Sequence, residues 1–408
     1  MIAPGRKRGD ARWRGVPGLH AAARLVRLRA PGPAGQDSER HATWLELFFD
    51  LVIVLALTSA TARLGTDASP DTRRALTALG VFLLVQWAWF SQSFYDTRFD
   101  PDDGPHRLLV FAAAIGAGGL ALGAHQVPHG LLLPIGYLLL RGALILMYLR
   151  VFGTRRSARP VATVYLAGFG TGWLLWLASL ALAPSTRPVL WAVALLLELS
   201  TPWLGHRWLA RHPVDRSHLP ERVGQYVIIL LGSTLANLLS AVPLHGRNGE
   251  AVAAAAVAFL VPACLWWVYT TFLTSGLAAS RLRGGQGYAY LHAPVGAAIL
   301  FLGWALGQVV REVAAGSERL PGVLRLVLGV SIGVWMLTGL ALHRLSLGAV
   351  ARIRLVLAFL GVAAAGLVMA VVTRPLLALT LTAAVLVGYA IVVSREIVRV
   401  GPAPANHP

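Results

Sequence analysis

The sequence predicts an all-α integral membrane protein of about twelve transmembrane helices, arranged as two parallel six-helix repeats. Three observations support this prediction: the composition, the spacing of apolar runs and the positions of basic residues. Of the 408 residues, 56% are hydrophobic and only 13% are charged, and the mean hydropathy is +0.64. An average soluble protein has roughly a quarter of its residues charged. This composition excludes most soluble enzymes and makes the lipid bilayer the first expected partner.

Apolar runs of the length that crosses a bilayer, about 20 residues, occur twelve times and predict a multi-pass protein. The runs 108–124 and 375–394 are the least distinct, because the first is short and only Arg374 and Pro375 separate the second from its neighbour. In order, the runs lie near residues 44–64, 75–95, 108–124, 130–152, 161–183, 188–209, 223–243, 251–275, 288–309, 322–343, 353–373 and 375–394.

The basic residues predict how the chain is oriented. If the N-terminus is cytoplasmic, 26 of the 36 Lys and Arg residues fall on the cytoplasmic side, 9 fall on the opposite side, and Arg141 lies inside the fourth run. Cytoplasmic loops carry such an excess of basic residues, and an odd number of helices would scramble it. We therefore expect both termini in the cytoplasm. The net charge of +18 is then chiefly an orientation signal, and no nucleic-acid partner is expected.

An internal repeat divides the chain into two halves. The segment 46–55 aligns with 221–230 at an offset of 175 residues, and 87–89 aligns with 266–268 at an offset of 179. Six helices per half is an even number, so both halves enter the membrane in the same direction, as in a parallel repeat. The predicted units are a basic, disordered cytoplasmic tail at 1–43, the first repeat at 44–209, a cytoplasmic linker at 210–222, the second repeat at 223–395 and a short cytoplasmic tail at 396–408.

The run from Trp44 to Val54 resembles the first-helix signature of the bacterial low-temperature-requirement A family of polytopic membrane proteins, and clear motif matches continue to about residue 300. The resemblance implies a multi-pass protein of the bacterial cytoplasmic membrane with no agreed substrate. Ser233 and the pair Thr270-Thr271 depart from the family, whose members usually carry acidic residues there, so a function that uses those carboxylates would be altered or lost. The family motif residues include Arg98, His218, Arg222 and His292.

Ionisable groups within the apolar runs predict a pathway for an ion or substrate, because such groups are costly in a bilayer and are functional candidates by default. Glu46 and Asp50 are four residues apart and therefore share one helix face. Their alternative role is to sit at the headgroup boundary, where the helix dipole favours acids. Glu198 is flanked by leucines and must be neutral, paired or facing water; Arg141 is its obvious partner, although by depth Arg141 belongs nearer the external half. The predicted pathway residues are Glu46, Asp50, Glu198, Glu221, Gln225 and Ser233.

Four tryptophans lie deeper in the runs than an aromatic belt at the membrane surface requires. They are Trp87, Trp89, Trp266 and Trp267, and they occupy equivalent places in the two halves. We expect them to face a central cavity.

An acidic loop after the second run supports a different hypothesis. Clustered carboxylates suit Mg²⁺, and Asp96, Asp100 and Asp103 could hold this ion as in prenyltransferases, whereas Asp100, Asp102 and Asp103 match the short protonating motif of some terpene cyclases. The alternative is a solvated loop in which Arg98 and Arg107 pair with the aspartates. Mg²⁺ is the one cofactor that this hypothesis would add.

The favoured hypothesis is transport or conduction of a small ion or solute without a catalytic residue, cofactor or metal. Its rival is an intramembrane enzyme that acts on a hydrophobic prenyl or lipid substrate through the acidic loop and stabilises cationic intermediates on aromatic rings. A membrane scaffold without any ligand is the third reading. The sequence leaves the oligomeric state open, including a homo-oligomer.

Overall fold

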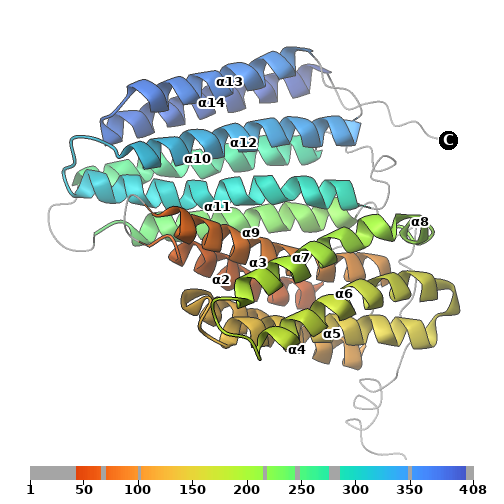
Figure 1. Cartoon of the computed structure of the whole chain (residues 1–408). Helices are drawn as coiled ribbons and strands as arrows, with labels where there is room; N and C mark the ends of the chain where they lie inside the picture. Colours follow the sequence, from red (N-terminus) through yellow and green to blue (C-terminus); the bar gives the residue numbers. More distant parts are fainter. Residues whose placement is uncertain are drawn as a thin grey trace, which may run out of the picture.

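The computed structural model describes residues 43–65, 70–99, 103–214, 218–243, 249–274, 285–347 and 352–400. Throughout these residues the chain is helical and contains no strand, so the predicted all-α class is confirmed. The long helices lie side by side in one stack, from α4 and α5 to α13 and α14 (Figure 1). The predicted tail up to residue 42, Asp100, Asp102 and residues 401–408 fall outside the described part of the chain.

Each of the twelve predicted apolar runs coincides with a long helix. Short connections make consecutive long helices run in opposite directions, as Figure 1 shows. The first six are α2 (Trp44–Ala62), α3 (Thr72–Phe99), α4 (Gly104–Gly123), α5 (Leu132–Thr154), α6 (Arg159–Ser179) and α7 (Arg187–Leu204). Shorter pieces are η1 (Ala124–Gln126), η2 (Arg156–Ala158) and α8 (His206–Leu209). The second six are α9 (His218–Ser240), α10 (Gly249–Thr274), α11 (Gln286–Ala314), α12 (Gly322–Leu347), α13 (Arg352–Val371) and α14 (Pro375–Val400).

Eleven helices in the described residues are long and apolar enough to cross a membrane, and they make the chain a multi-pass membrane protein. The remaining long helix, α7, has 18 residues. Arg187 and Glu198 lower its hydropathy, yet both side chains are buried against the protein. A charged residue can be accommodated in a membrane helix when it faces the bundle, so α7 still packs among the other helices.

Two predicted boundaries are displaced because hydropathy detects only the apolar part of a helix. The chain is already helical at His218, within the predicted linker, where Pro220 stands in the first turn of α9, a position that tolerates proline. At the other end of the chain, α14 continues past the predicted boundary at 395 to Val400.

The first helix begins with two reciprocal hydrogen bonds that fix its entry into the bundle. The Glu46 backbone N–H donates to the Thr43 hydroxyl over 3.2 Å, and the Thr43 backbone N–H donates to Glu46 Oε2 over 2.8 Å. This capping box satisfies backbone donors that a helix start leaves unpaired. It also holds the Glu46 side chain at the first turn of α2.

The two sets of six helices pack in the same pairwise order. In the first set, α2 contacts α3 and α4, α4 to α7 contact one another in sequence, and α3 contacts α7; α9, α10, α11 and α14 make the corresponding contacts in the second set. This order supports the repeat, which remains a prediction. The sets meet where α2 and α3 pack against α9 and α11, and we call this boundary the seam.

Glycines allow α9 and α11, both in the second set of helices, to approach each other closely. A Cβ atom on Gly303 of α11 would lie 2.7 Å from Thr234 Oγ1, and one on Gly307 would lie 3.0 Å from the Asn237 carbonyl oxygen. Thr234 and Asn237 both belong to α9. Small residues four positions apart permit such close packing in membranes, and here they fix the position of α9.

Candidate functional site

The strongest ionic contact across the seam joins Asp50 of α2 to Arg222 of α9. Arg222 Nη1 donates to Asp50 Oδ2 over 2.7 Å, and Nη2 donates to Oδ1 over 3.1 Å. The Trp89 indole N–H, from α3, donates to Asp50 Oδ1 over 2.7 Å. All three side chains are buried. A two-pronged pair between guanidinium and carboxylate is among the stronger hydrogen-bonded contacts in proteins, and this one ties three helices together.

Aromatic and amide groups complete the surroundings of Arg222. Its guanidinium carbon lies 5.3 Å from the centre of the Trp89 ring, and Trp89 stacks on Tyr226 with ring centres 4.6 Å apart. Arg222 Nη1 also donates to Gln225 Oε1 over 2.9 Å. The cation is therefore held by a carboxylate, the face of an aromatic ring and an amide oxygen.

A second contact with an acid crosses the seam at the same end. His218 Nε2, in the first residue of α9, lies 3.5 Å from Glu46 Oε1 in the first turn of α2. Both side chains are buried, and the contact is ionic when His218 is protonated. We call Glu46, Asp50, Trp89, His218 and Arg222 the seam network.

The far end of the seam is joined by neutral groups instead. The Asn237 amide donates to the Thr61 hydroxyl over 3.4 Å. The Trp304 and Gln308 side chains each donate to the Gly65 carbonyl oxygen over 3.1 Å. Among the described residues, the charged contacts of the seam thus lie at one end.

A second buried charge pair lies within the first six helices. Arg141 Nη2 of α5 is 2.7 Å from Glu198 Oε2 of α7. The Tyr137 hydroxyl donates to the same oxygen over 2.5 Å and accepts from Arg141 Nη2 over 2.7 Å. We call these three residues, which are fully buried, the Glu198 cluster. The structure brings Arg141 to Glu198, the partner that the sequence suggested for it.

Neighbouring helices shape the space around the Glu198 cluster. The Arg141 guanidinium lies 4.4 Å from the centre of the Phe169 ring, and Trp87 packs edge-to-face on the same ring with ring centres 6.4 Å apart. A Cβ atom on Gly172 of α6 would lie 2.6 Å from Glu198 Oε1. The glycine therefore leaves the space that the carboxylate occupies.

Replacing Gly172 with alanine should destabilise the protein by about 1–3 kcal/mol, as overpacking of a filled interior usually does. The new methyl group would push Glu198 away from Arg141. The measurement is the unfolding free energy in detergent micelles. Gly170→Ala on the same helix is the matched control, because nothing lies within 4 Å of a Cβ atom there. Equal stability of the two variants would contradict the prediction.

The other pathway candidates are not gathered around one carboxylate. The Ser233 hydroxyl donates to the Leu230 carbonyl of its own helix over 2.7 Å. Gln225 belongs to the surroundings of Arg222, and Glu221 is half-buried in the first turn of α9. Glu198 lies in the first half, in a cluster of its own. Asp50 and Glu46 are therefore the pathway candidates that face the second half of the chain.

Only two of the four tryptophans that were predicted to face a cavity are buried. Trp87 and Trp89 are buried, but Trp266 and Trp267 are 44% and 55% exposed. The prediction is wrong for the second pair. The repeat alignment matches positions along the helix, but α10 presents this stretch at its surface, where Trp267 donates to the Ser394 hydroxyl of α14 over 2.9 Å.

Two family motif residues that are not in the seam network also make hydrogen bonds to neighbouring segments. His292 Nδ1 donates to the Tyr288 carbonyl over 2.7 Å, and its Nε2 accepts from the Tyr269 hydroxyl over 3.0 Å. Arg98 Nε donates to the His212 carbonyl over 2.9 Å. Arg98 thus has a partner other than the aspartates that were expected.

In the acidic loop, the described aspartates face cationic or amide partners. Asp96 lies 3.5 Å from His106 Nε2 and accepts from the Gln92 amide over 3.1 Å. Asp103 caps α4 and pairs with Arg150, whose Nη1 donates to Oδ1 over 2.8 Å. The described residues contain no group of three or more His, Cys, Asp and Glu side chains arranged for a metal. Asp100 and Asp102 lie outside the described residues. Mg²⁺ binding by Asp96, Asp100 and Asp103 and catalysis by Asp100, Asp102 and Asp103 therefore stay predictions.

The Asp103 pair should make stability depend on acid pH. Burial raises the pKa of Asp103, but hydrogen bonds from Arg150 and the His106 backbone outweigh it, so the pKa lies below its ordinary value. A carboxyl group with a lowered pKa stabilises the fold above its unfolded pKa of about 3.9, and this contribution is lost as pH falls through the lowered value. Wild type should be more stable than Asp103→Asn at pH 7, and the difference should shrink below about pH 4. Asparagine also caps helices, so a pH-independent difference in melting temperature would contradict the ion-pair explanation.

Comparison with known proteins places the chain in a family. The profile described as "Bacterial low temperature requirement A protein" matches residues 41–391. An uncharacterized protein of Rhizobium meliloti (strain 1021) is 27% identical in an alignment of 263 residues that covers 58% of this chain and 63% of the relative. The chain thus spans just under two thirds of that relative's length. The profile match extends across both sets of helices and includes the seam network and the Glu198 cluster. The chain therefore belongs to the bacterial low temperature requirement A family.

Proposed function

We propose that the protein moves a small ion or solute across the bacterial cytoplasmic membrane and that the seam between α2 and α9 is the part that opens. The observation that carries this proposal is the asymmetry of the seam: Asp50–Arg222 and Glu46–His218 cross it at one end, and neutral hydrogen bonds cross it at the other. Access to a site between two halves requires one end to open while the other stays closed.

The physical chemistry of the seam network suits a gate at one end. A buried ion pair is costly to break when its groups stay dry, but water that enters an opened seam can solvate both charges. The ion pair therefore stabilises the closed arrangement, and water can take its place in the open one. A two-state element requires such alternative contacts. Rigid-body movement of the two sets of helices would separate Asp50 from Arg222 without unfolding either helix.

The orientation proposed for this gate is cytoplasmic. The starts of α2 and α9 lie at the same end of the bundle as the ends of α3, α5 and α7. The basic residues near these ends make up the excess counted from the sequence, and such an excess marks the cytoplasmic side. Both chain termini are then cytoplasmic as well.

Purified full-length protein in liposomes tests the proposal. Fluxes of H⁺, Na⁺, K⁺ and Cl⁻ would be measured with ion-sensitive dyes for wild type, Asp50→Asn and protein-free vesicles. We expect wild type to raise at least one flux several-fold over protein-free vesicles and Asp50→Asn to change that flux several-fold. Asp103→Asn is the matched control, because it removes an ion pair at the same end but between α4 and α5. Wild-type fluxes equal to those of protein-free vesicles, or equal effects of the two variants at equal folded amounts, would reject the gate.

A further inference from the structure

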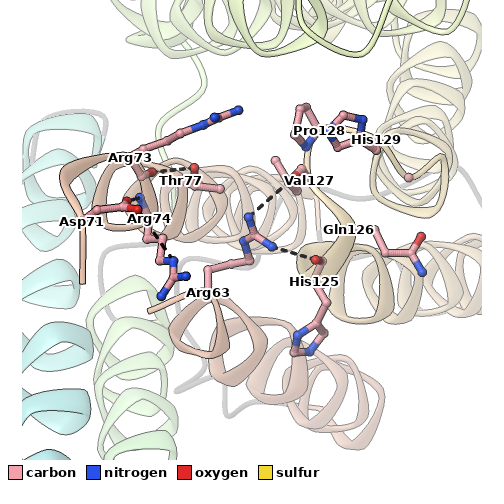
Figure 2. A pocket seen from close by; sticks show the side chains of 11 residues that line it. Arg63, Asp71, Arg73, Arg74, Thr77, His125, Gln126, Val127, Pro128 and His129 are labelled. Carbon is pink, nitrogen blue, oxygen red and sulfur yellow. Dashed lines mark hydrogen bonds and ion pairs between the residues drawn. The ribbon is translucent and has the colours of Figure 1, made fainter. Parts of the chain in front are cut away.

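A basic pocket lies at the end of the bundle opposite the seam network. Its volume is about 730 Å³. It is formed by the residue after α2, the start of α3 and the loop between α4 and α5. Figure 2 shows Arg63, Arg73 and His129 around this space.

The loop side of this pocket is held firmly by arginines. Arg63 Nη1 donates to the His125 carbonyl over 2.7 Å, and Arg63 Nη2 donates to the Val127 carbonyl over 3.3 Å (Figure 2). Arg187, at the start of α7, donates to the His129 carbonyl over 3.2 Å. Arginines at the end of α2 and the start of α7 therefore hold the backbone of this loop in place, and the loop forms one wall of the pocket.

Positive charge exceeds negative charge in this pocket. Arg63, Arg73 and Arg74 line it together with His125, His129 and a single acid, Asp71. Asp71 is already engaged, because its Oδ1 accepts from the Arg74 backbone N–H over 2.7 Å and its Oδ2 lies 3.8 Å from Arg74 Nε. Within the described residues, Arg63 bonds only to carbonyl oxygens and Arg73 has no carboxylate partner.

The position of Arg73 and Arg74 favours an anion beside them. Arg73 and Arg74 stand in the first turn of α3, where Asp71 just before the helix is the one neighbouring acid among the described residues, and a helix start favours anions over cations. They also lie on the side of the membrane that carries few basic residues in this chain. A bound anion would face the guanidinium groups and the start of α3 together and would offset the excess positive charge there.

We propose that this pocket binds a phosphate group, carried either by an anionic lipid headgroup or by a free phosphate compound. Guanidinium groups match phosphate oxygens in charge and geometry, and helix starts bind phosphate through the same partial positive charge. The pocket is larger than one inorganic ion and lies at the end of membrane-spanning helices, where headgroups and dissolved phosphates both reach it.

Arg73→Gln tests the proposal, because Arg73 is exposed and the one side chain that bonds to it among the described residues, Thr77, uses its backbone carbonyl. Arg319→Gln is the matched control: Arg319 is exposed at the same end, in the connection between α11 and α12, and does not line the pocket. In the first arm, full-length protein in zwitterionic detergent is titrated with inorganic phosphate at constant ionic strength set with chloride, and binding is read by thermal shift. In the second arm, the amount of co-purified phosphatidylglycerol is measured by mass spectrometry after reconstitution in mixed phosphatidylcholine and phosphatidylglycerol.

We expect Arg73→Gln to weaken binding about threefold to tenfold in one arm, while Arg319→Gln binds as wild type does. Loss in the phosphate arm identifies a free phosphate compound, and loss in the lipid arm identifies a headgroup. Equal binding by the two variants in both arms, or no binding by wild type in either, would overturn the proposal. Neither arm measures transport, so the result is independent of the gate.

Discussion

Replacing Arg141 with leucine should destabilise the protein by about 3–5 kcal/mol, as removal of one member of a buried ion pair does. Glu198 would keep its charge or take up a proton in the middle of the bundle, with the Tyr137 hydroxyl as its remaining strong partner. Either outcome is costly, because the Glu198 side chain is fully buried and would lack its charged partner. The unfolding free energy in mixed micelles is the measurement.

The double variant Arg141→Leu with Glu198→Leu separates structural from functional importance. Apolar side chains can replace both members of a buried pair at little cost, so the double variant should recover most of the stability lost by Arg141→Leu alone. Recovered stability with unchanged flux would make the Glu198 cluster purely structural. A double variant no more stable than Arg141→Leu would contradict the assignment of the loss to an unpaired Glu198.

The helices were predictable from the sequence because lipid sets a simple requirement of length and polarity. The twelve runs were found by that requirement alone, even for α7, whose Arg187 and Glu198 weaken the signal. The exact starts of the helices were not predictable, because hydropathy ignores polar residues such as His218 and Arg222 at the beginning of α9. Two members of the seam network, His218 and Arg222, therefore fell in the predicted linker.

Partners across the bundle were harder to predict than the residues themselves. Asp50 was singled out, but the repeat alignment set it opposite Gln225, and only packing shows that Arg222 bonds to it. The alignment likewise could not tell which face of α10 carries Trp266. Tyr137 was missed, although it stands four residues before Arg141 and so shares its helix face. That spacing was the available signal for the Glu198 cluster.

Removing the Asp50–Arg222 pair should also have a large effect, and a double-mutant cycle can isolate the contact. We expect Asp50→Ala and Arg222→Ala each to destabilise the protein and the two changes to be coupled by more than about 1.5 kcal/mol, as close charge pairs are. The reason is that each single change leaves the other charged group buried at the seam, with Trp89 and Gln225 as its neighbours.

The control cycle combines Asp50→Ala with Arg150→Ala, which lies at the same end but pairs with Asp103. Sites without shared partners add within about 0.5 kcal/mol, so this coupling should be near zero. A small coupling between Asp50 and Arg222 would mean that the seam is held by packing alone, and the gate would then lose its physical basis. A large coupling would show that this ion pair helps to tie the two halves together, as the proposed gate requires.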